Sequence, residues 1–299
     1  MNNANPFLHS VVDIMIPLLL AASGGLFTEL GGMLNIALEG LLLTGAFFAV
    51  VAVHYTGSLA LGILGAVLGS MLLAAILGGA TLRLRSNVFI TGLAANLFAS
   101  GVTVVLSQKF FGTRGVVVLR KIPDIRGLNV SLFRNIPVIG DVFFGHTFYV
   151  YIGALILLAS WLALYKTPFG FRLRACGKHS PALVSLGLRP DACRFAAFLA
   201  SGFACGLGGS FLSLNLGAFV PNISAGKGWI ALVVIFLGGR KPQGILLAVF
   251  VFGLADAFSN YAQEFFNGPA DFVLAFPYLL TLLVMVGVSI AAKRNTRVS

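Results

Sequence analysis

Residues 34–53 read LNIALEGLLLTGAFFAVVAV and contain one charged side chain, Glu39. A helix needs about 20 predominantly apolar residues to cross the hydrocarbon core of a bilayer, and this stretch meets that requirement. The rest of the 299-residue chain is similar, with 58% hydrophobic and 10% charged residues. Soluble domains carry about 25% charged residues, and disordered chains are poor in hydrophobic residues. A soluble enzyme and a disordered protein are therefore both excluded.

Apolar runs without charge predict an all-α polytopic membrane protein, a bundle of about nine helices within a range of eight to ten. The expected spans are 10–28, 34–53, 59–82, 88–106, 147–165, 194–214, 228–239, 242–261 and 273–292. The run at 228–239 is short for a full crossing, so we expect either a tilted and extended helix or half of a broken one. We predict one transmembrane domain over 1–299.

The basic residues predict the orientation of the chain. Its net charge is +11, and no basic run is interleaved with exposed aromatics, so nucleic-acid binding is not expected. With nine crossings and the C-terminus inside, about two thirds of the Lys and Arg residues lie on the cytoplasmic side, as the positive-inside rule requires. This orientation makes 107–146 an external loop and 166–193 a cytoplasmic one. The outer group comprises Lys109, Arg114, Arg120, Lys121, Arg126, Arg134 and Lys227.

Two glycine-rich segments predict an internal repeat. GGLFTEL at 24–30 matches GGSFLSL at 208–214 at four of seven positions, and helix-breaking residues follow both segments. The copies lie five spans apart and would face opposite ways. Interrupted hydrophobic segments at matching positions of an inverted repeat are typical of a transport site near the membrane midplane. The alternative is a chance match in a chain rich in Gly, Leu and Phe.

Polar side chains within the apolar segments are candidates to line a solute pathway. Because a carboxylate at the bilayer centre is costly, such residues should face protein or water. The candidates are Asn35, Glu39, Asn96, Asn215, Asn222, Asp256 and Asn260. Asp256 and Asn260 are four residues apart and share a helix face. The alternative for each residue is an interhelical hydrogen bond, and Glu39 could also cap a broken helix.

Enzyme chemistry has no support in the sequence. No nucleophile–base motif is present, and the four His residues lack metal-ligand spacing, so no metal and no cofactor are expected. The segment GKHS at 177–180 lacks the glycine and the Ser/Thr that a phosphate-binding loop requires, so the chain should not hydrolyse ATP by itself. Cys176, Cys193 and Cys205 have no CxxC spacing and are expected to be reduced thiols or small core residues.

The cytoplasmic segment predicts a short helix between two spans. Ser180-Pro181 is a helix start, and Gly187 is a natural stop about two turns later. Such a helix could transmit force from a docked partner. The alternative is an ordinary connecting loop.

Several motifs, in order over 24–292, resemble permease subunits of bacterial ABC importers of the branched-chain amino-acid/ribose type. The resemblance is strongest to the nucleoside and simple-sugar branch, whose relatives include riboflavin importers. The matching stretches are LNIALEG (34–40), NVFITG (87–92) through Asn96, the loop 170–187, SG (201–202) through GG (208–209), GKGWIA (226–231) and FGLAD (252–256).

The resemblance implies one permease half of a transmembrane dimer in the bacterial inner membrane, surrounded by lipid, that moves a nucleoside, a simple sugar or riboflavin. It implies three partners: a cytoplasmic ABC ATPase, a second permease, and an external substrate-binding protein or lipoprotein. The expected ATPase-coupling residues are Gly170, Arg174, Gly177, Pro181, Ala182 and Gly187. The rival hypothesis is an ion-coupled secondary transporter with Glu39 or Asp256 as its cation or proton site.

Overall fold

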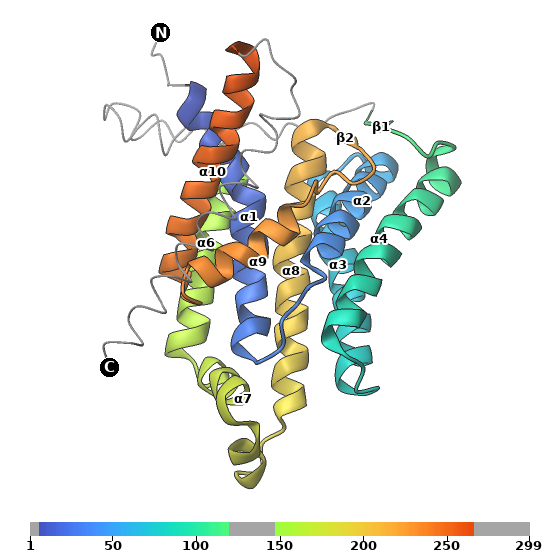
Figure 1. Ribbon diagram of the computed structural model, residues 1–299. Coiled ribbons are helices and arrows are strands. Elements are labelled where there is room, and N and C mark those ends of the chain that lie inside the picture. Colours follow the sequence, from blue (N-terminus) through green and yellow to red (C-terminus); the bar gives the residue numbers. More distant parts are fainter. Residues whose placement is uncertain (1–5, 120–146, 266–299) are drawn as a thin grey trace.

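The computed structural model describes residues 6–119 and 147–265 as a bundle of long helices (Figure 1). The helices are α1 (Pro6–Leu30), α2 (Leu38–Thr56), α3 (Leu59–Leu82), α4 (Val88–Phe111), α6 (Phe148–Lys166), α7 (Pro168–Ser185), α8 (Pro190–Leu216), α9 (Lys227–Leu237) and α10 (Pro242–Phe265). Two short strands, β1 (Val117–Val118) and β2 (Ala218–Phe219), pair antiparallel.

The predicted helical membrane bundle is confirmed. Seven helices in the described part of the chain are long and apolar enough to cross a membrane. The run expected at 228–239 forms α9, which has only 11 residues. It is therefore the broken-helix alternative that holds for this run. The span expected at 273–292, most of the external loop 107–146 and its basic residues from Arg120 to Arg134 lie outside the described residues.

Helix α8 lies at the centre of the bundle and packs on α1, α2 and α3 (Figure 1). Small residues let the backbones approach closely, as expected for helices in lipid. A Cβ on Gly206 would lie 2.7 Å from Val67 Cα of α3, and a Cβ on Gly24 of α1 would lie 2.8 Å from Ala204 Cβ. α8 is therefore the central helix of the bundle, and its neighbours on either side pack directly against it.

Two interrupted segments leave the long helices and turn back into the bundle. In Figure 1, α1 ends near α7, whereas α8 starts near α7 and ends at the opposite end of the bundle. The segment 31–37 then leads from α1 into α2, and 217–226 leads from α8 into α9. The repeated glycine-rich segments occupy the C-terminal ends of α1 and α8, which run in opposite directions, as an inverted repeat requires.

Gly209 tests whether the close contact between α8 and α2 supports the fold. A Cβ at this position would clash with the Leu42 carbonyl and lie 2.6 Å from Ala46 N. We expect Gly209→Ala to cost about 1–3 kcal/mol through overpacking and to lower the apparent Tm of the purified protein in detergent. Gly101→Ala is the matched control, because a Cβ on Gly101 meets nothing within 4 Å. Equal Tm values for Gly209→Ala and the wild type would contradict the prediction.

Candidate functional site

The N-terminal ends of α2 and α9 meet at Glu39, the second residue of α2. Its Oε1 accepts hydrogen bonds from Ser224 Oγ at 2.6 Å and from the Gly226 N–H at 2.8 Å, and its Oε2 accepts one from the Gly228 N–H at 2.7 Å. These N–H groups belong to the first turn of α9 and have no partner within the helix. The carboxylate also faces the positive end of the α9 dipole. Glu39 therefore caps a broken helix, one of the roles considered from the sequence.

Two asparagines hold the first interrupted segment. From α4, Asn96 Oδ1 accepts the Gly40 N–H at 2.8 Å, and Asn96 Nδ2 donates to the Ile36 carbonyl at 3.0 Å. Asn35 Nδ2 donates to the buried Ser201 Oγ of α8 at 2.9 Å. Asn96 of α4 thus caps the start of α2, and Asn35 ties the segment before α2 to α8. Glu39 of α2 caps α9 in the same way. We call Asn35, Glu39, Asn96, Ser224 and 226–228 together the helix-end junction.

The second interrupted segment has an unusual backbone. Asn222, Ala225 and Gly226 have φ values of 57°, 45° and 81°. Asn and Gly adopt this left-handed region more readily than other residues, whereas Ala225 is held there against its preference. Ser100 Oγ of α4 donates to Asn222 Oδ1 at 3.1 Å. A polar contact to α4 therefore holds this segment in its turned conformation.

Lys227 lies in a place that the topology count did not anticipate. It was assigned to the outer group, but it is the first residue of α9, between the two glycines whose N–H groups bind Glu39. The segment 217–226 turns back into the bundle before α9 begins, so Lys227 lies beside Glu39, and its assignment to the outer side stays a prediction. The seven pathway candidates are placed as follows: Asn35, Glu39 and Asn96 belong to the junction, Asn222 flanks it, and Asn215, Asp256 and Asn260 stand apart.

The three residues outside the junction, Asn215, Asp256 and Asn260, differ in their helix or in their burial. Asn215 is exposed near the end of α8, and Asp256 and Asn260 lie on α10, the former half-buried and the latter exposed. In the part of the chain that the structure describes, no hydrogen bond joins any of the three to the junction. Ser224 and Ser100 were missed. The polar, turn-forming sequence around 222–226 was the available signal for Ser224.

Helix α7 protrudes at one end of the bundle (Figure 1) and contains a kink. His179 has non-helical dihedrals (φ −154°, ψ 77°), and the short helix predicted from Ser180-Pro181 follows it. Gly187 ends this helix with φ 73°, as predicted. The first half of α7 was not predicted, although Thr167 and Pro168 form a helix start: Thr167 Oγ1 accepts the Gly170 N–H at 3.3 Å.

The expected coupling residues separate into two groups. Pro181 and Ala182 are exposed beyond the kink. Gly170, Arg174 and Gly177 instead anchor the first half of α7, since a Cβ on Gly170 would clash with the Ala163 carbonyl, and a Cβ on Gly177 would clash with the Leu30 carbonyl. The guanidinium of Arg174 lies 4.7 Å from the ring centre of Tyr165.

The cysteines are free thiols, as expected. Burial, together with the nearby Cys193, raises the pKa of Cys176 to about 11. This thiol therefore stays protonated at neutral pH and is a poor nucleophile. In residues 6–119 and 147–265, no cluster of three His, Cys, Asp or Glu side chains could hold a metal ion.

Broken helices whose ends meet inside an apolar bundle are typical of membrane transport proteins. The chain belongs to the family of the branched-chain amino acid transport system / permease component, whose model matches residues 8–288. It is therefore a permease subunit of an ABC importer and a multi-pass protein of the bacterial plasma membrane. No solved structure matches the chain.

Three curated relatives are similar over almost their whole length. The guanosine ABC transporter permease protein NupQ of Bacillus subtilis is 33% identical over 91% of this chain and 88% of its own. The nucleoside ABC transporter permease protein NupC of Lactococcus lactis is 33% identical over 99% and 98%. The putative glucose ABC transporter permease protein TsgC13 of Haloferax volcanii is 29% identical over 95% and 92%.

Glu39→Gln tests the cap on α9. The amide keeps the size of the side chain, but it removes the charge and turns an NH₂ group toward a backbone donor. Hydrogen bonds to a charged group contribute about 1.5–3 kcal/mol each, so we expect a clear loss of stability, measured as a lower Tm in detergent. Asn215→Ala is the control, because Asn215 is exposed and outside the junction. A wild-type Tm for Glu39→Gln would show that the cap contributes nothing.

Proposed function

We propose that this chain is the permease half of an ABC importer for nucleosides, and that the solute passes along the helix-end junction. Nucleosides are proposed as the solute because the chain is 33% identical, over nearly its full length, to two permeases named for guanosine and nucleosides. A simple sugar is the second candidate, supported by the relative named for glucose at 29% identity. Riboflavin has no support from these relatives.

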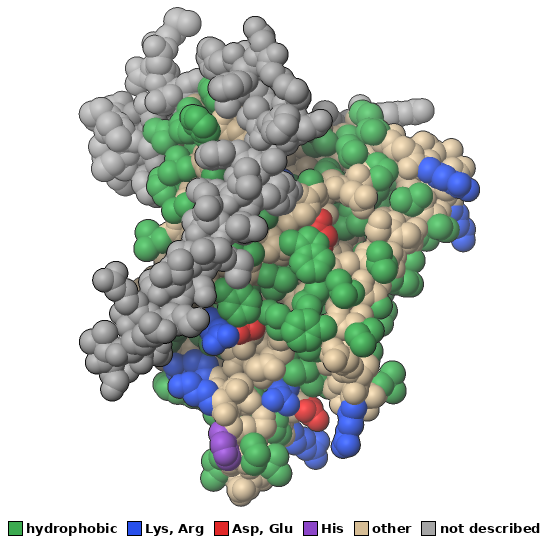
Figure 2. Space-filling view, in the orientation of Figure 1, with side chains coloured by type: hydrophobic (Ala, Val, Ile, Leu, Met, Phe, Trp, Pro, Cys, Tyr) green, Lys and Arg blue, Asp and Glu red, His purple; other side chains and the backbone are tan. Residues whose placement is uncertain are grey.

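The surface around the junction suits a flat polar solute. Trp229 follows the capped start of α9 and is 42% exposed, and the Asn222 side chain is also exposed. An aromatic face can stack on a nucleobase, and an amide can hydrogen-bond to its edge. Figure 2 shows acidic side chains among apolar ones on this side of the bundle. We propose Asn35, Glu39, Asn96 and Asn222 as pathway residues, with Asn215, Asp256 and Asn260 as outlying members.

The tip of α7 is the proposed dock for a cytoplasmic ATPase. Beyond the kink, Val184 and Leu186 are 60% and 75% exposed, and Pro181 and Ala182 are exposed beside them. Exposed apolar side chains outside the apolar bundle are typical of a protein-binding surface. The tip would fit a groove of the ATPase, and a second permease and an external substrate-binding protein or lipoprotein would complete the importer. This chain itself would have no ATPase site.

Transport would follow from two states of this assembly. Closure of the ATPase subunits on ATP would displace α7, and the helix ends at the junction would then open toward one side or the other. Coupling of this kind requires that the ATPase contact the tip differently in the two states. The ion-coupled alternative has less support, because both oxygens of Glu39 already accept hydrogen bonds from the chain itself.

Ala182→Asp tests the dock. A charge placed on the exposed apolar tip should prevent the ATPase from seating, so we expect uptake of tritiated guanosine by cells to fall at least about tenfold, as for an unpaired charge desolvated at an interface. Membrane insertion and Tm should stay normal, because Ala182 is exposed. Ala182→Ser is the matched control and should retain uptake. Normal uptake with Ala182→Asp would refute the role of the tip.

The energy source distinguishes the importer from an ion-coupled transporter. We expect an ATP-hydrolysing subunit to co-purify with the tagged chain and guanosine uptake to be lost when the phosphate-loop lysine of that subunit is replaced. A protonophore should leave ATP-driven uptake in proteoliposomes unchanged. Uptake that survives the ATPase variant and collapses with the protonophore would establish the ion-coupled alternative.

A further inference from the structure

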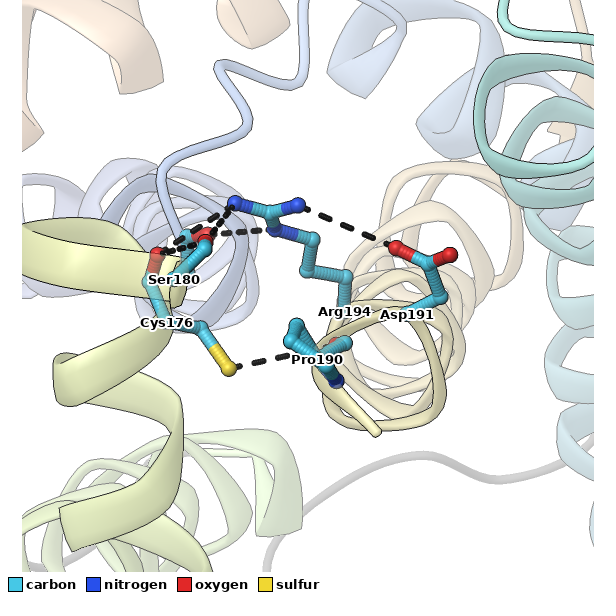
Figure 3. A network of polar contacts seen from close by, with 6 residues as sticks. Cys176, Ser180, Pro190, Asp191 and Arg194 are labelled. Carbon is cyan, nitrogen blue, oxygen red and sulfur yellow. Dashed lines mark hydrogen bonds and ion pairs between the residues drawn. The ribbon is translucent and has the colours of Figure 1, made fainter. Parts of the chain in front are cut away.

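Arg194, in the first turns of α8, contacts three elements at once (Figure 3). Its Nε donates to the Gly31 carbonyl at 3.1 Å, just beyond the end of α1. Its Nη2 donates to the Cys176 carbonyl at 3.3 Å and to Ser180 Oγ at 2.7 Å, which lie on the two sides of the kink in α7. One guanidinium therefore joins α8, the kink of α7 and the start of the first interrupted segment.

Arginine suits this position for a physical reason. The carbonyls at the end of α1 and before the kink of α7 have lost their partners in the helical ladder and carry the negative end of the helix dipole. A planar guanidinium with five N–H donors can bind acceptors in several directions, whereas an ammonium group acts as a point charge. The Arg194 side chain is only 20% exposed, so water competes little for these hydrogen bonds.

A second contact links the same elements without Arg194. Gly177 of α7 abuts the chain just after α1: a Cβ there would clash with the Leu30 carbonyl and lie 3.0 Å from Gly32 N. Gly32 itself has φ +78°, a conformation that favours glycine. The first half of α7 therefore cannot move toward α1 without displacing residues 31–32.

The interrupted segment carries this displacement to the junction. Gly31 and Gly32 are followed within the same short segment by Asn35, which is bonded to α8, and Ile36, which is bonded to Asn96. Glu39 comes next and caps α9. A continuous set of hydrogen bonds and backbone contacts thus leads from the kink of α7 to the start of α9.

We propose that Arg194 is a positioning residue that transmits movement of α7 to the helix-end junction. The proposal rests on the proposed function, in which the tip of α7 docks the ATPase. Without the guanidinium, the tip still docks and ATP is still hydrolysed, but α7 can move away from α1 without drawing 31–37 with it, because the Gly177 contact opposes only movement toward α1. The predicted defect is uncoupling, in which ATP turnover persists and solute movement does not.

The test is the ratio of tritiated guanosine taken up to ATP hydrolysed, measured in proteoliposomes that hold the purified complex with its substrate-binding subunit. For Arg194→Gln we expect this ratio to fall roughly tenfold or more, because hydrogen bonds to a charged group are lost. Co-purification of the ATPase and its hydrolysis rate should stay near wild type, whereas the lost hydrogen bonds should lower the Tm of the complex. Arg194→Lys should restore part of the ratio, because its ammonium group restores the positive charge but not the planar set of N–H donors of a guanidinium.

Asp191→Asn is the matched control on the same turn. Asp191 Oδ1 lies 3.8 Å from Arg194 Nη1 and its side chain is 70% exposed, so this ion pair should contribute little and the ratio should not change. If Arg194→Gln does not assemble, Ser180→Ala removes the 2.7 Å hydrogen bond from Arg194, together with the one that Ser180 Oγ donates to the Cys176 carbonyl, and should still lower the ratio.

Two outcomes would overturn the role of Arg194. One is an unchanged ratio in Arg194→Gln, or in Ser180→Ala where Arg194→Gln does not assemble. The other is a parallel fall of uptake and hydrolysis, which would make Arg194 a structural anchor only. A wild-type complex without an ATPase, or without ATP-dependent uptake, would instead refute the proposed function, and the role of Arg194 would fall with it.

Discussion

Backbone polar groups inside an apolar bundle must find partners within the protein, and this constraint governs the structure. Both interrupted segments leave backbone N–H and C=O groups at helix ends without partners in their own helix, and water cannot be relied on to supply those partners there. Glu39 meets the need at α9 and Asn96 meets it at α2. Since each cap comes from a different element than the helix it serves, satisfying the backbone also assembles the site. A polar junction at this place is the consequence of breaking two helices there.

The same constraint also links the elements around the junction to one another. The elements around it are joined at a few strong points: Asn35 to Ser201, Asn96 to α2, and Glu29 of α1 to Arg240 beyond α9, with Nε and Oε1 2.9 Å apart. Between these points α8 meets its neighbours through glycines and small side chains, which offer smooth surfaces. Because Asn96 links α4 to α2 and Glu39 links α2 to α9, a displacement of one helix is passed to the next through its cap.

Features that depend on the apolar environment or on the local sequence could be predicted from the sequence. The spans follow from apolarity, the short run at 228–239 was recognised as a candidate broken helix, and the stop at Gly187 follows from its freedom to adopt positive φ. Features set by long-range packing could not. Ser224 meets Glu39 across 185 positions, and nothing local to either residue specifies the other. The place of Lys227 next to Glu39 was not predicted for the same reason, since only the return of 217–226 into the bundle puts the start of α9 beside α2. The pathway role of the polar residues stays a prediction.

The kink in α7 divides this helix into two parts with different tasks. Before His179, the helix is fixed to the bundle by glycines at close contacts and by the stacked Arg174. After it, the chain is exposed, and His179 Nδ1 accepts the Ala182 N–H at 3.3 Å, which caps the second part locally. A continuous α7 would be one rigid body that both binds the partner and is fixed to the bundle. In the proposed function, a kink bridged by Arg194 on both sides would let the tip adapt to its partner, and Arg194 together with the Gly177 contact would carry that movement to residues 31–32.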